Sequence, residues 1–260
     1  MRKIIVGILG LLAMSFFSVP SFSQMKSAGK TMTWTTSSEA AKTLASTGAE
    51  HLMNAEFELA YEDLTAAVKL DPNFTVALTF LTNLTTGASQ KSYAQRAQSS
   101  ASNKTEGEKL FASLTNEKNT QEQRREIWSK LHTMFPDGGM IGHFYVLTRA
   151  TPDEQFAAAQ EYMKKFPDSG PMYNTLAYYY LTSKKDNAKA KECFEKYIAL
   201  YPDGYNPYDS MGEYYLLTGD MENSKKYYSM SLEKYPFNRS SLNALQKMAD
   251  DKKKSDDAKK

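Results

Sequence analysis

The sequence is poor in cysteine and histidine, the residues that most often build metal and redox sites. A single cysteine, Cys193, excludes an internal disulfide, so packing alone must hold the fold. The three histidines, His51, His132 and His143, have no metal-ligand spacing such as two histidines one helical turn apart. There is also no glycine-rich phosphate loop and no serine nucleophile elbow. The sequence therefore predicts no metal, no cofactor and no catalytic residue.

An excess of charge of one sign is also missing. The chain has 32 lysine and arginine residues against 30 aspartate and glutamate residues. Binding of nucleic acid needs a basic surplus gathered on one face, so this balance predicts no nucleic-acid partner. Hydrophobic residues make up 41% of the chain, a globular composition that excludes disorder over most of the length.

Long apolar runs are absent except at the N-terminus. There, two basic residues precede an apolar run over residues 4–19, which Pro20 ends. The run is shorter than the roughly 20 residues of a membrane-spanning helix. It therefore predicts a secretory signal peptide, residues 1–23, although an uncleaved membrane anchor stays open. No cysteine lies near the cut to carry a lipid, so we expect an exported protein, periplasmic or secreted, with no membrane span after cleavage.

Proline is scarce but regularly placed. Five similar tripeptides contain Pro72, Pro136, Pro167, Pro202 and Pro236. Successive prolines are 64, 31, 35 and 34 residues apart. A period near 34 residues is typical of repeat proteins. The first gap is close to twice the others, which indicates one repeat boundary without a proline.

The last two repeats align along both of their predicted helices, at an offset of 35 residues in the first helix and 34 in the second. Steps of three, one and three residues place Tyr208, Met211, Gly212 and Tyr215 on one helical face. The small residue Gly212 leaves room for a second helix, which the proline ends. Each repeat is thus predicted as a pair of short antiparallel helices.

The other repeats follow this plan less clearly. Thr36 and Glu39 have capping-box spacing and predict the start of the first helix of the array. Residues 105–167 give two weaker helix pairs. The poorest stretch, residues 85–107, is mostly Ser, Thr, Gln, Asn and Lys. Both a degenerate second helix and a mobile insertion are compatible with this composition.

These units resemble tetratricopeptide repeats. The family pattern has a small residue and an aromatic residue in the first helix, two small residues flanking an aromatic in the second, and a terminal proline. The last unit matches it with Gly212, Tyr215, Ser224, Tyr228, Ser231 and Pro236. The preceding unit departs from the pattern at Tyr197, where a small residue is usual. That departure suggests wider helix spacing in this unit.

The resemblance implies an all-α fold, an α-solenoid of stacked antiparallel helix pairs with about six units. The predicted repeat array covers residues 37–250, is weakest at 85–107, and includes a capping helix over residues 240–249. Residues 24–36 are predicted to be a flexible linker, and residues 251–260 a charged, disordered tail.

In the family, first helices line a concave surface that binds peptides or helices of partner proteins. The resemblance places Asn174 and Tyr178, with their counterparts Asp209 and Glu213, on that surface; a solvated face is the alternative. We therefore expect a non-catalytic scaffold or adaptor in the bacterial periplasm or envelope, with a protein or peptide partner. A periplasmic holdase-type chaperone stays open, as does an enzyme or a carbohydrate-binding protein that uses its tyrosines. The oligomeric state is also open.

Overall fold

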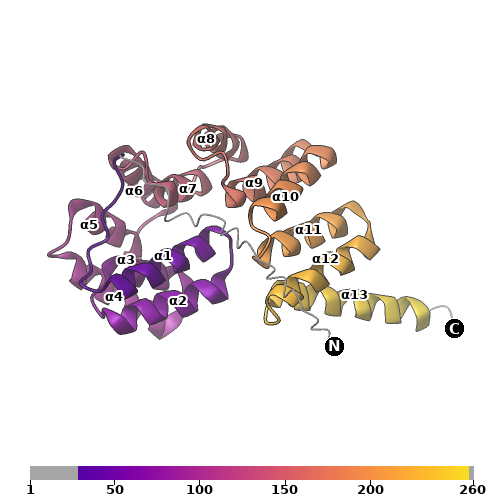
Figure 1. Cartoon of the computed structure of the whole chain (residues 1–260), viewed down its shortest axis with the longest axis horizontal. Coiled ribbons are helices and arrows are strands. Elements are labelled where there is room, and N and C mark those ends of the chain that lie inside the picture. Colours follow the sequence, from indigo (N-terminus) through magenta and orange to yellow (C-terminus); the bar gives the residue numbers. More distant parts are fainter. Residues whose placement is uncertain (1–28, 258–260) are drawn as a thin grey trace, which may run out of the picture.

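The computed structural model describes residues 29–257, except the side chain of Asp256, and within them helices are the only regular elements. Six antiparallel helix pairs follow one another around a curve, and one long helix ends the array (Figure 1). The first three pairs are α1 (Glu39–Met53) with α2 (Phe57–Leu70), α3 (Thr75–Leu84) with α4 (Gly87–Ala101), and α5 (Glu106–Ala112) with α6 (Gln121–Met134), where the short helix η2 (Ser113–Thr115) follows α5. The last three are α7 (Gly139–Leu147) with α8 (Pro152–Lys165), α9 (Gly170–Tyr178) and its π-helical extension η3 (Tyr179–Lys184) with α10 (Asn187–Leu200), and α11 (Asn206–Thr218) with α12 (Met221–Lys234). The closing helix is α13 (Arg239–Asp257). The predicted all-α solenoid is confirmed.

The regularly placed prolines stand just beyond the second helix of five of the six pairs. At Pro72 and Pro236 the preceding residues, Asp71 and Tyr235, have extended backbone with φ of −133° and −144°. A proline ring disfavours helical backbone at the residue before it, which ends the helix there. The long gap between prolines contains the pair α3–α4, whose boundary lacks a proline, as the spacing predicts.

Small residues of the first helices meet large residues of the second. A Cβ atom added to Gly48 would lie 2.8 Å from Cγ of Leu64. In the last pair, a Cβ atom on Gly212 would lie 2.8 Å from Cδ1 of Tyr228. Real Cβ atoms do not come this close, so only glycine lets the two helices of these pairs approach to the observed distance.

The polar stretch at residues 85–107 is largely helical and contains α4. This helix buries only Ala97 and Ala101. Polar side chains supplement this small apolar contact, as the 2.8 Å hydrogen bond between the hydroxyls of Thr75 and Ser100 shows. Of the two interpretations of this stretch, the structure therefore shows the degenerate second helix.

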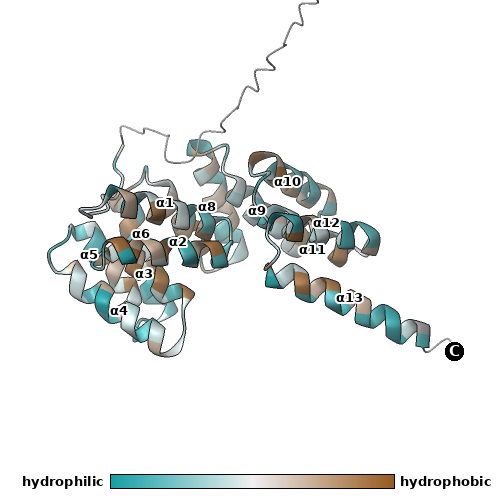
Figure 2. Ribbon diagram, turned by 60° about the horizontal axis from the view of Figure 1, so that its bottom comes forward, coloured by the Kyte–Doolittle hydropathy of each residue, from teal (hydrophilic) through white to brown (hydrophobic). Residues whose placement is uncertain are grey.

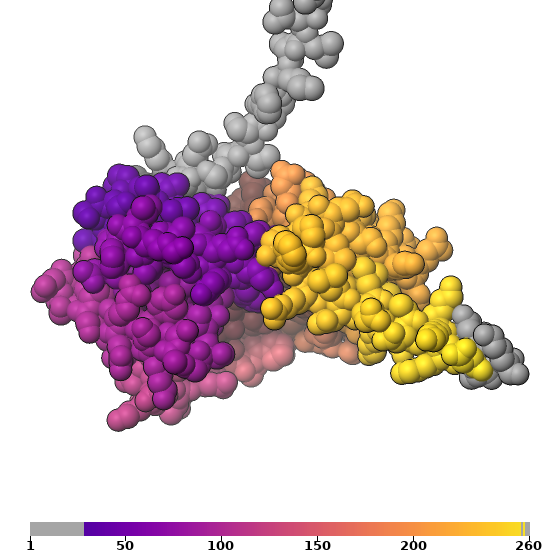
Figure 3. All heavy atoms as spheres, turned by 90° about the horizontal axis from the view of Figure 1, so that it is seen from below, coloured from indigo at the N-terminus to yellow at the C-terminus, as the bar shows by residue number. Residues whose placement is uncertain are grey.

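The curve of the array brings the first pair against the fifth and sixth, and in Figure 3 the purple first pair lies beside the yellow C-terminal end of the array. Glu56, fully buried before α2, accepts hydrogen bonds from Tyr201 Oη at 2.8 Å and from the Tyr205 N–H at 2.7 Å. Tyr197 Oη donates to Asn54 Oδ1 at 3.1 Å. Burial raises the pKa of Glu56. The superhelix is therefore closed by polar contacts between distant repeats.

Tyr197 explains the departure of the fifth unit from the repeat pattern. Its side chain is fully buried and lies against Gly170, where an added Cβ atom would be 3.1 Å from Tyr197 Cδ2. Glycine on the facing helix thus makes room for the ring, and the hydroxyl reaches Asn54 of the first unit. The aromatic residue serves contact between repeats, which a smaller residue could not make.

Both ends of the array differ from the sequence prediction. Residues 29–36, here called the N-terminal arm, run extended and contact the array, although the sequence predicts a flexible linker up to residue 36. The cap of α1 is Ser38, whose side chain accepts from the Ala41 N–H, instead of the predicted Thr36.

At the other end, α13 continues to Asp257, through residues predicted to be disordered, and projects from the body (Figure 2). Asp250 and Asp251 precede Lys254 by four and three residues, a spacing that favours helix. The predicted signal peptide, residues 1–23, lies outside the described residues. Between residues 29 and 257, no helix is both long and apolar enough to cross a bilayer.

Candidate protein-binding surface

The inner side of the curve has two parts. One is formed by α9 and α11, and the other by α3, α5 and α7, which lie beneath the N-terminal arm (Figure 1). Helix α1 crosses this inner side and packs against both α3 and α7. The first helices of the repeats therefore face the hollow, as the resemblance implies, but the chain itself fills part of it.

The first part, here called the α9–α11 face, carries all four residues predicted to bind a partner. Tyr178 on α9 donates a hydrogen bond of 2.6 Å to Glu213 Oε2 on α11. Burial, followed by the nearby Glu213 carboxylate, raises the pKa of Tyr178 well above its usual range, so its hydroxyl stays a neutral donor. Asn174 Oδ1 is buried and accepts no hydrogen bond from the part of the chain that the structure describes.

Asp209 has a different setting from its three neighbours. It is 8% exposed, and its carboxylate accepts from Asn238 Nδ2 at 3.0 Å, Ser240 Oγ at 2.9 Å and Ser241 Oγ at 2.5 Å. These donors lie at the start of α13. Asp209 therefore anchors the closing helix, and a partner would have to compete with that helix for its oxygens.

The second part of the hollow holds the N-terminal arm. Burial alternates along the arm as in a β-strand. The buried or half-buried residues are Met32, Trp34 and Thr36, and the exposed ones are Thr31, Thr33 and Thr35. The Trp34 ring meets Phe74 and Phe80 edge-on, each with ring centroids 6.4 Å apart, and the Thr36 hydroxyl donates to Asp71 Oδ2 at 2.6 Å. The arm thus lies in the hollow as an extended peptide does.

A buried carboxylate fixes the middle of the arm. Glu108 on α5 is fully buried and accepts from the Thr35 N–H and the Thr35 hydroxyl, both at 2.7 Å. The same carboxylate completes the capping box of Thr105. Lys104 Nζ donates to the Thr35 carbonyl at 2.8 Å. Backbone and side chain of one arm residue are therefore recognised together.

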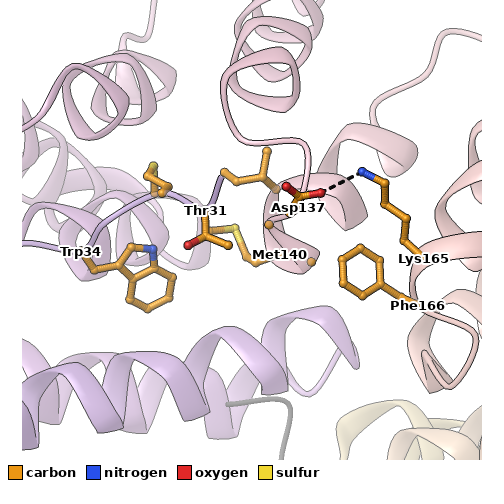
Figure 4. A pocket seen from close by; sticks show the side chains of 10 residues that line it. Thr31, Trp34, Asp137, Met140, Lys165 and Phe166 are labelled. Carbon is orange, nitrogen blue, oxygen red and sulfur yellow. Dashed lines mark hydrogen bonds and ion pairs between the residues drawn. The ribbon is translucent and has the colours of Figure 1, made fainter. Parts of the chain in front are cut away.

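A cavity of about 460 Å³ lies beside the arm (Figure 4). Trp34 and Met140 line it from the arm and α7, and Phe166 lines it from the end of α8. Asp137 and Lys165 form a 3.0 Å ion pair at this cavity, drawn as a dashed line in Figure 4. The arm therefore leaves space in the hollow, lined by apolar side chains and one ion pair.

The histidines and the cysteine have structural surroundings. His51 Nδ1 lies 2.9 Å from Asp63 Oδ2, and His132 stacks on Tyr145 with ring centroids 4.3 Å apart. His143 is 1% exposed, and burial lowers its pKa to about 4. Burial raises the pKa of Cys193 to about 11, which keeps the thiol protonated. Across residues 29–257, no cluster of three or more His, Cys, Asp or Glu side chains could hold a metal ion.

The tyrosine clusters, considered in the sequence for sugar stacking, pack mainly on one another. Tyr179, Tyr214 and Tyr228 are 7%, 7% and 3% exposed. The half-buried Tyr215 and Tyr227 stack with ring centroids 5.4 Å apart. Ring faces that are used in this way are not available to a sugar.

Sequence reasoning missed the closing contact and the arm. Tyr201 stands next to Pro202 at a repeat boundary and Glu56 stands in the turn between α1 and α2, and neither position indicates a contact with another repeat. The arm did carry a signal, because apolar Met32 and Trp34 alternate with threonines over residues 31–36, which is typical of an extended segment.

A curved stack of antiparallel helix pairs with an inner binding face defines the class of α-solenoid repeat proteins. Within it, residues 170–203, which contain α9, η3 and α10, match the family model of the tetratricopeptide repeat. The chain therefore contains a tetratricopeptide repeat inside an all-α, tetratricopeptide-like solenoid. No curated protein matches the sequence.

Several solved structures have a similar fold at low sequence identity. PilW, a widely conserved type IV pilus biogenesis factor, is 12% identical, with 80% of this chain and 100% of that chain covered and a TM-score of 0.47. TTC0263, a thermophilic TPR protein of Thermus thermophilus, is 14% identical, with 80% and 98% covered and a TM-score of 0.45. The Cut9–Hcn1 hetero-tetramer of the APC/C is 14% identical, with 80% and 42% covered and a TM-score of 0.49.

Proposed function

We propose that the chain is a non-catalytic protein-binding scaffold of the bacterial envelope that holds a peptide or helix of a partner on the α9–α11 face. The tetratricopeptide repeat at residues 170–203 supports a protein partner, because this repeat is a protein-interaction module. The envelope location rests on the signal-peptide pattern of residues 1–23. N-terminal sequencing of the protein from its own cells should give a first residue of Gln24.

The unpaired oxygen of Asn174 carries the proposal. The oxygen is buried without a hydrogen bond, which costs free energy, but the residue as a whole is only half-buried, so a turn of the amide would bring the oxygen to a backbone N–H of a partner and remove that cost. An asparagine amide can also donate to a backbone carbonyl, so one side chain can hold both groups of a peptide. Tyr178 and Glu213, joined by their hydrogen bond, lie on the same face and would contact the same partner.

Site-specific photo-crosslinking tests this assignment. A photoreactive residue placed at Asn174 or Glu213 should capture one protein in the cell envelope, whereas the same residue at exposed Lys196 on α10 should not. In the purified complex, Asn174→Ala should weaken binding about tenfold, which corresponds to one hydrogen bond of about 1.4 kcal/mol. Equal capture from all three positions, or unchanged affinity, would remove the α9–α11 face as the binding site. Asp209→Ala is a poor probe because it also releases α13.

A holdase-type chaperone is the alternative within the same class. Such a protein needs a large continuous apolar surface for unfolded clients. The most exposed large apolar residues, Phe57, Leu217 and Phe237 (55%, 58% and 71%), lie on α2, on α11 and between α12 and α13. Titration with a reduced, unfolded test protein separates the two roles. A scaffold with one partner should ignore it, and saturable binding would support the holdase.

A further inference from the structure

We infer that the groove beneath the N-terminal arm is a second peptide-binding site, which the chain's own residues 29–36 occupy until an extended segment of a partner protein replaces them. The groove, here called the arm groove, is lined by Phe74 and Phe80 of the second repeat, by Glu108 on α5 with Lys104 just before it, and by Asp137 before α7. Only the existence of a partner rests on the proposed scaffold function. The α9–α11 face is a separate surface.

The arm is bound as a ligand is bound. It is extended, its own residues alternate between groove and solvent, and its hydrogen bonds go to the array. At its first end, the Lys30 N–H donates to Asp137 Oδ2 at 3.0 Å, and the Asp137 N–H donates to the Lys30 carbonyl at 3.3 Å. Both bonds use only backbone groups of Lys30, so they can hold any extended chain, whatever its side chain at this position.

The side-chain contacts define what else can bind. Met32 is 7% exposed and packs beside the Phe135 ring over Gly107, where an added Cβ atom would lie 2.5 Å from Phe135 Cζ and 3.2 Å from Met32 Cγ. Two residues on, Trp34 meets two phenylalanine rings. The next residue, Thr35, gives a backbone N–H and a hydroxyl to Glu108. The partner segment is therefore an extended peptide with an apolar residue, an aromatic residue two places later, and then a threonine or serine.

Two features make the arm an exchangeable occupant. Ordering the arm costs conformational entropy at every position, while only Met32 and Trp34 bring large apolar side chains into the groove. The 460 Å³ cavity next to Met32 and Trp34 further shows that the arm leaves space unfilled. A better-fitting segment can therefore compete with it. The carboxylate of Glu108 favours such replacement over an empty groove, because the loss of both bonds from Thr35 would leave a buried charge with donors from Thr105 alone.

Competition with a free peptide tests the inference. The probe is a fluorescently labelled synthetic peptide with the sequence of residues 29–37, titrated into the purified full chain by fluorescence anisotropy. The variant that combines Met32→Ala with Trp34→Ala keeps the groove residues intact, but its arm binds the groove less tightly. Its affinity for the peptide should therefore be at least tenfold higher than that of the original chain. Adding Glu108→Gln to this variant should lower the affinity again by at least tenfold, because an amide accepts hydrogen bonds less strongly than a carboxylate. The control Phe237→Ala removes an aromatic ring outside the groove and should leave peptide binding unchanged.

Three results would overturn the inference. One is equal, weak binding of the peptide to the original and arm-weakened chains. Another is unchanged affinity of a peptide whose tryptophan is replaced by alanine. A third is concentration-dependent dimerisation of the arm-weakened variant, which would assign the groove to a second copy. Should that variant lose helical content, Thr35→Val replaces it, since it removes only the hydroxyl bond to Glu108. Crosslinking at Asn174 reports on the α9–α11 face alone, so the two proposals can fail separately.

Discussion

The two parts of the hollow differ in what satisfies their polar groups. In the arm groove, the buried carboxylate of Glu108 receives two hydrogen bonds from Thr35 of the chain itself. On the α9–α11 face, the Tyr178 hydroxyl and Glu213 satisfy each other, but Asn174 Oδ1 is buried and has no partner among the described residues. All repeats therefore share the same plan of paired helices, but their inner surfaces differ. The arm occupies the arm groove, whereas the α9–α11 face has a hydrogen-bond acceptor without a donor.

This difference has a cause in the way the array closes. A solenoid whose repeats touch only their neighbours keeps its whole inner side open. Here the first pair contacts the fifth and sixth through Glu56, Tyr201 and Tyr205, and α1 therefore crosses the hollow. The arm, which precedes α1, is carried into the groove of α3 and α5. Closure thus decides which part of the inner side stays available.

The largest expected effect is at the closing contact. Glu56→Ala leaves the Tyr205 N–H and the Tyr201 hydroxyl without their acceptor in a buried place. The free energy of unfolding should fall by about 3 kcal/mol. Urea denaturation measures this, and the transition should broaden because the two ends of the array no longer unfold together. The matched control is Glu58→Gln, which affects a single bond from Tyr205 Oη and should cost less than about 1 kcal/mol. Equal effects of the two changes would show that Glu56 does not close the array.

A second prediction concerns pH and the core behind the arm. His143 is buried and neutral in the folded protein, with a pKa lowered to about 4, whereas the unfolded chain binds a proton near the ordinary value of 6.5. Since the unfolded state then binds more protons, stability is full above 6.5 and is lost as the pH falls toward 4. Between pH 7 and 5 this residue should contribute a loss of roughly 2 kcal/mol.

Urea denaturation at both pH values, with His143→Phe for comparison, checks this loss. The variant should show a smaller fall in stability between pH 7 and 5 by that amount. The same slope in both proteins would mean that His143 is not buried in its neutral form.

The third effect is the attachment of the arm. Trp34 is half-buried against Phe74 and Phe80, so Trp34→Ala should lower the free energy of unfolding by about 1 to 2 kcal/mol, in proportion to its buried apolar area. Calorimetry of the full chain measures the change. Phe237→Ala, which truncates an aromatic residue that is 71% exposed, should be close to neutral. A neutral result for Trp34→Ala would mean that the arm adds nothing to the stability of the array.

The smallest effect is expected on the α9–α11 face. Tyr178→Phe removes the hydrogen bond to Glu213 and should cost about 1 kcal/mol of stability. Tyr180→Phe, two residues further along the chain, is the control. Thermal unfolding of both variants gives the comparison. A loss as large as that of Glu56→Ala would show that this face is part of the structural framework and not a surface left available to a partner.

Local patterns in the sequence predicted what local contacts determine. Pro72 and Pro236 end helices because a proline acts on the residue next to it, and Gly212 marks a close helix contact because Tyr228 lies 16 residues away in the same pair. The polar helix α4 was ambiguous because hydrogen-bonding side chains supplement its small apolar contact, and the periodicity of apolar residues does not register them.

Contacts between distant repeats could not be predicted in this way. Glu56 and Tyr205 are 149 residues apart, and nothing in either repeat alone indicates that they meet. The bulky Tyr197 was recognised as a departure, but its reason lies in Asn54 of another repeat. Asp209 occupies a position typical of a binding surface, yet the start of α13 uses its oxygens. A residue that one repeat alone predicts to bind a partner can therefore be assigned that role only when its contacts with the other repeats are known.

Amide hydrogen exchange of the full chain, followed by mass spectrometry of a peptide fragment that covers residues 30–38, tests the division of the hollow most directly. We expect the Thr35 N–H, held at 2.7 Å from Glu108 Oε1, to exchange much more slowly than in the free peptide, and the combined Met32→Ala and Trp34→Ala variant to lose this protection. Exchange at the free-peptide rate in the original chain would contradict the division, because the arm groove would then be as available to a partner as the α9–α11 face.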